Sequence, residues 1–281
     1  MKFEVKAELK YQVKADSTII LNIHALNNQH QKVISETFST FPSTTYKFLA
    51  PTLAENRLLS IEIPPHEKFS ISYQATVENV YRIKDYTKAD DLVIAKLSPE
   101  ILIYLQPSRY CQSDKLYRLA NNLFGYKKND FEKVSAITHW IYLNIAYLSG
   151  STNSQTSAYD TVSQQEGVCR DFAHLGIALC RALTIPARYF TGYAYGLTPP
   201  DFHACFEAYI NGEWLLFDAT KMAPLNGMIK IATGKDAADA AVASIFGEVN
   251  FVSSKVSCDL IDDDFKPFEP DYQEKLGISY L

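Results

Sequence analysis

The sequence predicts an α+β protein in which a β-sandwich precedes a second unit of helices packed on an antiparallel sheet. Three observations support this prediction. Residues 3–84 alternate apolar and polar side chains in several runs, with no helical stretch among them. Apolar residues recur at helical spacing between residues 114 and 183. Residues 203–217 alternate again around an Asn-Gly turn. We place the division between two domains, 1–108 and 109–281.

Composition excludes several classes of protein. The 281 residues are 47% hydrophobic, which is enough for two modest cores or one large core. A net charge of −5 argues against a nucleic-acid partner. No apolar run reaches the roughly 20 residues that span a bilayer, and the first residues lack the apolar segment of a secretion signal. Five cysteines without framework spacing indicate free thiols in a reducing compartment. We therefore expect a cytoplasmic protein with no membrane partner; its oligomeric state is not specified.

The first unit reads as consecutive strands. Alternation predicts them over residues 3–13, 18–26, 31–40, 57–63 and 68–84. Five or six strands of this kind favour a sandwich of about 100 residues. His24, His30 and His66 are scattered through these strands and the loops between them, so we interpret them as ordinary residues without a catalytic role.

The second unit begins with helices over about 114–124 and 130–146. Residues 149–157 are polar, and they are open to two interpretations, a mobile loop at a functional site or a plain surface loop. Past residue 220 we expect a strand at 229–232, a helix over 236–246 and a strand over 249–260. The acidic residues that follow have no calcium-loop spacing and predict a solvated tail.

Cys169 opens a further helix. Phe172, Leu175, Leu179 and Leu183 recur at helical spacing, and Ile185-Pro186 ends the run. Unpaired backbone N–H groups at a helix N-terminus favour a thiolate over a thiol, and the same groups can stabilise an oxyanion. The commonest fate of a free cysteine is to be a small buried hydrophobe. Cys180, about 16 Å further along the same helix, fits that description and is too distant for a disulfide with Cys169.

A hairpin brings a histidine and an aspartate together. Asn211-Gly212 predicts a two-residue turn in which Ile210 pairs with Glu213. In this register His203 and Asp218 lie on one face as diagonal neighbours, because side chains alternate with period two. The aspartate can then hold the imidazole in one tautomer while its other nitrogen addresses a thiol. Cys169, His203 and Asp218 are therefore the candidate nucleophile, base and orienting residue.

These residues occur in a familiar pattern. The segments GVCRDFAHL, IPAR, HACFE, GEW and DAT, in this order, resemble the transglutaminase-like superfamily of enzymes, and residues 231–247 resemble the tail of its bacterial branch. The resemblance is specific over roughly residues 115–250 and general over 1–105. It implies a papain-like core, and for the bacterial branch an N-terminal β-domain. Cys205 stands where the family usually has Trp, and Ala219 where it usually has Pro.

The resemblance implies acyl transfer through a thioester on Cys169, with a protein or peptide as the expected substrate. Transfer to water gives a peptidase or amidase, and transfer to an amine gives a transglutaminase. We prefer hydrolysis because water needs no second binding site. A silent binding module with this fold is the alternative from another class. Gln164 and Gln165 are candidates to donate an amide N–H to the oxyanion, although their spacing does not match the papain pattern.

No cofactor and no metal is expected. Cys169, His203, Cys205 and Asp218 could supply ligands to zinc, but the sequence has no close C-x-x-C or H-x-x-x-H pair. Metal binding is therefore the less favoured reading of these residues.

Overall fold

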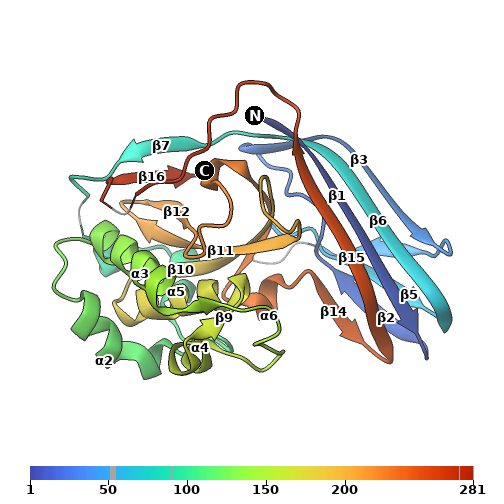
Figure 1. Cartoon of the computed structure of the whole chain (residues 1–281), viewed down its shortest axis with the longest axis horizontal. Coiled ribbons are helices and arrows are strands. Elements are labelled where there is room, and N and C mark those ends of the chain that lie inside the picture. The colour runs from blue at the N-terminus through green and yellow to red at the C-terminus, as the bar shows by residue number, and fades with distance from the viewer. Residues whose placement is uncertain (51–54, 90, 272, 281) are drawn as a thin grey trace.

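The computed structural model describes residues 1–50, 55–89, 91–271 and 273–280, and it has a β-sandwich on one side and a mixed helix–sheet unit on the other (Figure 1). The α+β architecture predicted from the sequence is confirmed. Among the residues described, no helix is long and apolar enough to cross a membrane. The cytoplasmic location stays a prediction.

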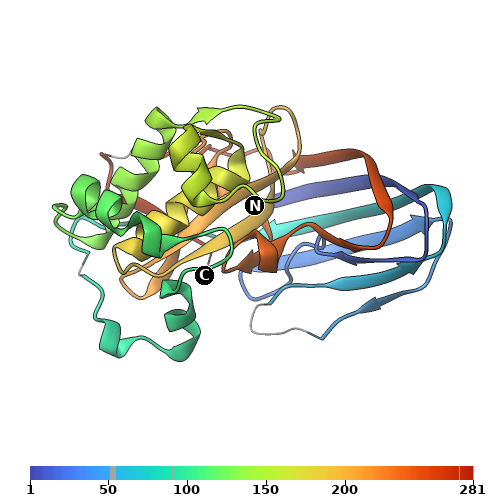
Figure 2. The same cartoon turned by 90° about the horizontal axis from the view of Figure 1, so that it is seen from below.

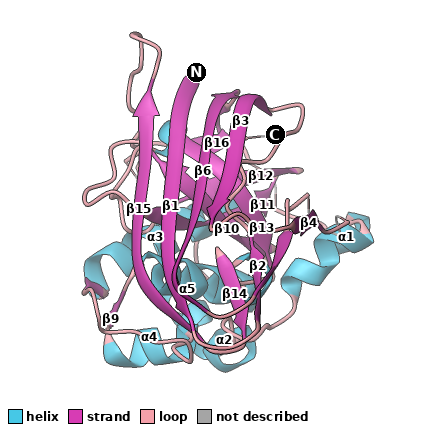
Figure 3. Cartoon of the chain, turned by 90° about the vertical axis from the view of Figure 1, so that its right-hand side faces the viewer, coloured by secondary structure: helices cyan, strands magenta, loops and turns pink. Residues whose placement is uncertain are grey.

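The sandwich consists of two four-stranded sheets, with strand orders β15-β1-β6-β3 and β14-β2-β5-β4 (Figure 3). Its strands are β1 (Lys2–Val13), β2 (Ser17–Leu21), β3 (Gln31–Phe41), β4 (Tyr46–Phe48), β5 (Leu59–Ile63), β6 (His66–Asn79), β14 (Ala243–Phe246) and β15 (Val249–Leu260). Alternation explains the two-layer arrangement, because every second residue of β1 from Phe3 to Val13 is buried between the sheets.

The second unit is built on a six-stranded sheet with the order β13-β10-β11-β12-β16-β7. Its strands are β7 (Arg82–Asp85), β10 (Ala187–Ala194), β11 (Phe202–Ile210), β12 (Glu213–Phe217), β13 (Met228–Gly234) and β16 (Leu276–Ser279). The helices are α1 (Pro99–Leu102), α2 (Ser113–Phe124), α3 (Asp130–Asn144), α4 (Ala158–Gln164), α5 (Cys169–Ala182) and α6 (Ala237–Ala240). A parallel pair of two-residue strands, β8 (Ala146–Tyr147) and β9 (Glu166–Gly167), lies beside the helices.

Helix α5 is central to the second unit. Helices α2, α3 and α4 gather around it on one side of the sheet (Figure 2). Its approach to β11 is close because Gly176 has no side chain: a Cβ at this position would lie 2.5 Å from the ring of Phe206. This packing sets the position of the first turn of α5 relative to the strands of the hairpin.

Most predicted elements are confirmed, and one is corrected. The helix expected over 236–246 is wrong: only Ala237–Ala240 are helical, and Ala243–Phe246 form β14, which pairs with β2. The alanine-rich composition suggested a helix, but the sheet supplies hydrogen-bond partners that local propensity does not reveal. Leu276–Ser279, which follow the acidic residues, form β16 between β12 and β7, a strand that the sequence did not predict.

The sheets mix the two ranges that the sequence had separated at residue 108. Strands β14 and β15 pair in the sandwich, although they follow the helices in the chain. Strand β7 pairs with β16 in the sheet of the second unit, although β7 precedes the helices in the chain. The boundary between residues 108 and 109 stays a prediction. Strands that precede it pair with strands that follow it, both in the sandwich and in the six-stranded sheet.

Candidate active site

Cys169 is the first residue of α5 and is half-buried. The start of the helix is held by Asp171, whose carboxylate accepts the backbone N–H of Val168 at 3.0 Å and pairs with Arg170 at 3.0 Å. A carboxylate in the first turn satisfies an otherwise unpaired donor and suits the positive end of the helix dipole. The thiol therefore lies at a well-capped helix N-terminus, as the sequence predicted.

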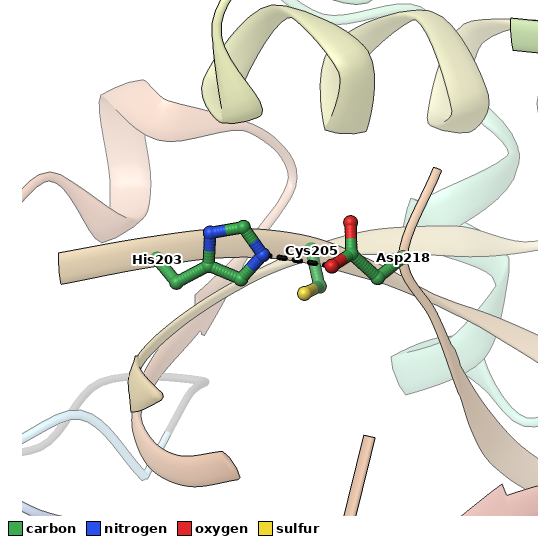
Figure 4. Close-up of side chains that lie close together, drawn as sticks. All are labelled: His203, Cys205 and Asp218. Atoms are coloured by element: carbon green, nitrogen blue, oxygen red, sulfur yellow. Dashed lines mark hydrogen bonds and ion pairs between the residues drawn. The ribbon is translucent and has the colours of Figure 1, made fainter. Parts of the chain in front are cut away.

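His203 and Asp218 meet through the hairpin of β11 and β12. The observed register pairs Ile210 with Glu213 and Phe206 with Phe217, as the Asn-Gly turn predicts. The Nε2 atom of His203 lies 2.8 Å from the carboxylate of Asp218 (Figure 4). Thr220 donates its backbone N–H at 2.8 Å and its hydroxyl at 2.7 Å to the other oxygen of the same carboxylate. Both oxygens of Asp218 thus have fixed partners.

The two charges hold each other in the ionised form. Burial alone would lower the pKa of His203, but the charge of Asp218 and hydrogen bonds from Asp218 and Cys169 raise it well above its usual value. Burial alone would raise the pKa of Asp218, but the charge of His203 and hydrogen bonds from His203 and Thr220 lower it. Each group therefore stabilises the charged form of the other.

The three residues predicted from the sequence come together. The thiol of Cys169 lies beside the ring of His203 and contributes to raising its pKa. Because Nε2 of His203 faces Asp218, the second ring nitrogen, which points away from Asp218 in Figure 4, is left for the thiol. Thiol, imidazole and carboxylate thus form a row that begins at the N-terminus of α5 and ends just past β12.

Tyr147 is a neighbour of the thiol that sequence reasoning missed. Its hydroxyl lies beside the backbone N–H and the thiol of Cys169, and burial and the nearby thiol raise its pKa. Tyr147 pairs with Gly167, two residues before Cys169, and its ring packs against Phe172 at 5.8 Å between centroids. Two paired residues leave no detectable periodicity, so nothing in the sequence could have identified this contact.

The two glutamines predicted as oxyanion donors lie at the end of α4. Both side chains are exposed, and Gln165 adopts a left-handed conformation (φ 59°). The backbone carbonyl of Gln165 accepts the N–H of Ala146, which helps to hold β8 in place. The side-chain role of Gln164 and Gln165 stays a prediction.

Cys205 lies directly beside the charge pair. Its sulfur, the His203 nitrogen and an Asp218 oxygen are all within 4.8 Å of one another, and all three residues are buried. Burial and the nearby charge of Asp218 raise the pKa of Cys205 to about 12, so its thiol is neutral. Within the described part of the chain, these three side chains form the cluster that could hold a metal ion.

Other polar residues of the sheet have structural partners. Glu207 pairs with Arg188 and with Lys230, each at 2.6 Å. The guanidinium of Arg188 also lies 4.2 Å from the ring centroid of Trp214. These contacts tie β10, β11, β12 and β13 together away from the thiol.

Comparisons with known proteins give matches in both halves of the chain. A model described as the N-terminal domain of bacterial transglutaminases matches residues 1–100, and one described as the transglutaminase-like superfamily matches residues 117–219. A crystal structure from Cytophaga hutchinsonii, named as a proposed cysteine protease, is 50% identical and covers 99% of this chain and 97% of that chain, with a TM-score of 0.97.

Two mycobacterial relatives are more distant. An uncharacterized Mycobacterium leprae protein is 25% identical over 230 residues, which are 76% of this chain and 81% of the relative. A Mycobacterium tuberculosis protein is 30% identical over 190 residues, which are 62% of this chain and 59% of the relative. The matches support a papain-like thiol enzyme as the general class. The chain therefore belongs to the transglutaminase-like superfamily and carries the N-terminal domain found in its bacterial members.

Proposed function

We propose that this protein is a thiol-dependent acyl-transfer enzyme that cleaves amide bonds of a protein or peptide substrate. The observation that carries the proposal is the buried pair of His203 and Asp218, joined at 2.8 Å and hydrogen-bonded to a thiol at the N-terminus of α5. An imidazolium stabilises a thiolate, and the carboxylate keeps the imidazole oriented and charged.

In the proposed reaction the Cys169 thiolate attacks the carbonyl carbon of the amide. The tetrahedral oxyanion receives hydrogen bonds from the backbone N–H of Cys169 and from the hydroxyl of Tyr147, which already lies against that N–H. His203 gives its proton to the leaving amine as the carbon–nitrogen bond breaks, and a thioester remains. Water, deprotonated by His203, then releases the acid and regenerates the thiol.

Hydrolysis is the preferred outcome. Its support is the Cytophaga hutchinsonii structure, 50% identical over nearly the whole chain and named as a proposed cysteine protease. Transfer of the acyl group to an amine differs only in the last step, so it requires the same thioester. The silent binding module is disfavoured because thiol, imidazole and carboxylate are all present.

The first test is the alkylation of Cys169 by iodoacetamide at about pH 6.5, located by mass spectrometry. At this pH a free thiol with a pKa of about 8.5 is almost entirely protonated and reacts slowly. We expect Cys169 of the wild type to react much faster than free N-acetylcysteine, and the His203→Ala variant to lose this advantage. Cys180, buried in the same helix, is the internal control and should stay unmodified. Equal rates for Cys169 in both proteins and for the free thiol would overturn the proposal.

A further inference from the structure

Three donor atoms of different chemistry converge at one point of the sheet. They are a ring nitrogen of His203, Sγ of Cys205 and a carboxylate oxygen of Asp218, all within 4.8 Å of one another. Nε2 is the ring nitrogen of His203 that faces Asp218 (Figure 4). His203 and Cys205 lie two residues apart on β11 and therefore share a face, and Asp218 follows directly after the paired strand β12. The exposed fractions of the three residues are 1%, 1% and 6%. Two hydrogen-bonded strands thus hold the donors in place.

Imidazole nitrogen, thiolate sulfur and carboxylate oxygen are the ligands that zinc prefers. We propose that His203, Cys205 and Asp218 form a binding site for Zn²⁺, and that the bound ion switches off the chemistry at Cys169. Cys169 is not a ligand in this proposal, because it contacts His203 while Nε2 of that ring faces Asp218. Three protein ligands leave the fourth position of a tetrahedral zinc ion to water.

The donor set balances the charge of the ion. Zn²⁺, a neutral imidazole, a carboxylate and a thiolate sum to zero. No net charge is therefore buried together with the ion, which reduces the electrostatic cost that normally opposes an ion in a buried site.

One of the three ligands borders a cavity. Asp218 lines a cavity with a volume of about 450 Å³, which also contacts Ser135 and Thr138 of α3, Lys221 and Glu274. Carboxylates on the cavity wall, among them Glu274, attract a cation, and the side chain of Lys221 opposes this attraction.

The inhibitory effect rests on the proposed function, whereas the binding site does not. A zinc ion on Nε2 prevents this nitrogen from carrying a proton, so His203 cannot be the imidazolium that the proposed reaction uses. The Cys169 thiolate then lacks its counter-ion, and the N–H on the second ring nitrogen is too weak an acid to protonate the leaving amine readily. Cys205 is the one ligand that takes no part in the proposed acyl transfer, so its substitution separates metal binding from catalysis.

The binding test uses Co²⁺ as a spectroscopic substitute for Zn²⁺ on the full chain. In the Cys169→Ala protein we expect one ion per chain and a thiolate-to-cobalt charge-transfer band that Zn²⁺ abolishes. The further substitution Cys205→Ser, which keeps the size of the buried side chain, should remove the band and weaken binding by about 100-fold. Cys258→Ser is the matched control and should leave the band unchanged, because Cys258 lies on β15 in the sandwich.

Absence of the charge-transfer band from the Cys169→Ala protein would overturn the proposed metal site. So would a band that persists when Cys205 is also substituted. Thermal unfolding of each variant shows whether it is folded. If the Cys205→Ser variant is not folded, Cys205→Ala is used in its place.

The inhibition test measures the alkylation rate of Cys169 with and without Zn²⁺. We expect Zn²⁺ to slow the reaction by about tenfold or more in the wild type, and to change it little in Cys205→Ser, each relative to its own metal-free rate. Equal slowing in both proteins would mean that zinc binds Cys169 and His203 directly, and would overturn the proposal. If Cys169 is unreactive even without zinc, the proposed function fails, while the cobalt titration still decides the site.

Discussion

At the scale of single residues, the thiol has more partners than the two that a sequence motif would suggest. Tyr147 contributes a hydroxyl that lies against both the backbone N–H and the sulfur of Cys169. That N–H is the donor expected to bind the oxyanion in the proposed reaction, so the Tyr147 hydroxyl lies beside the place where a substrate oxygen would bind. From there the hydroxyl can act as a second donor to the oxyanion.

We predict that Tyr147→Phe slows acylation of Cys169 by p-nitrophenyl acetate while leaving its alkylation by iodoacetamide nearly unchanged. Acylation passes through an oxyanion and alkylation does not, so only the former needs the hydroxyl. Loss of one oxyanion donor typically costs about 10²–10³ in rate, and a half-exposed donor should lie at the low end. Tyr159→Phe is a matched control, since the exposed fractions of Tyr147 and Tyr159 are 45% and 46%. Parallel loss of both reactions would contradict the role of Tyr147 as an oxyanion donor.

At the scale of elements, the hairpin of β11 and β12 contains a buried charge pair that makes its stability depend on pH. His203 has a raised pKa in the folded protein, so its contribution is complete below the unfolded value of about 6.5 and is lost as pH rises through the folded value. Asp218 has a lowered pKa, so its contribution is complete above about 3.9 and is lost as pH falls through the folded value.

We therefore predict that Asp218→Asn reduces the free energy of unfolding most between about pH 4 and pH 6.5, by about 1.5–3 kcal/mol, the value of a hydrogen bond to a charged group. The difference from wild type should shrink as the pH moves away from this range on either side. Urea unfolding at several pH values measures it. A difference that does not vary with pH would show that His203 and Asp218 are not an ion pair.

The helix and the hairpin differ in how they are specified. The start of α5 at Cys169 follows from its apolar spacing and from the Asp171 cap, both of which are local. The hairpin register follows from Asn211-Gly212, where positive φ angles of 51° and 86° are needed. The site is assembled only when Gly176 lets α5 approach Phe206, a contact between elements about 30 residues apart.

At the scale of the whole molecule, the chain leaves the sandwich, builds the unit that contains the thiol, and returns. Strand β15 pairs with β1 along nearly its whole length, from Phe3 with Leu260 to Val13 with Val249. Strand β14 completes the opposite sheet beside β2. The sandwich is thus closed by residues that follow the site in the chain, and the chain passes between the two units after β6, after β13 and after β15.

We predict that a fragment of residues 1–108 does not unfold cooperatively by itself, because each of its sheets lacks an outer strand and β1 has unpaired backbone groups. Adding a peptide of residues 243–260 should restore a cooperative urea transition, followed by circular dichroism. The same peptide with Val256→Asp should fail, since Val256 is buried, whereas Ser254→Asp, at an exposed position, should work. A cooperative transition of the fragment alone would show that 1–108 is an independent domain.

The sequence by itself determined the features that depend on near neighbours. Alternation identified the strands of the sandwich, helical spacing placed Cys169 at the start of α5, and the Asn-Gly turn set His203 and Asp218 on one face. These features depend on backbone geometry repeated over a few residues, so a short window of sequence contains the information.

Only the tertiary structure decided the rest. Four features join segments that are distant in the chain or lie on different elements. They are the return of β14 and β15 to the sandwich, the insertion of β16 between β12 and β7, the contact of Tyr147 with Cys169, and the position of Cys205 beside the charge pair. A strand pairs wherever backbone donors and acceptors and an apolar face are available, and many segments meet this requirement equally well. The choice among them is made by the packing of the whole molecule, which leaves no local mark in the sequence.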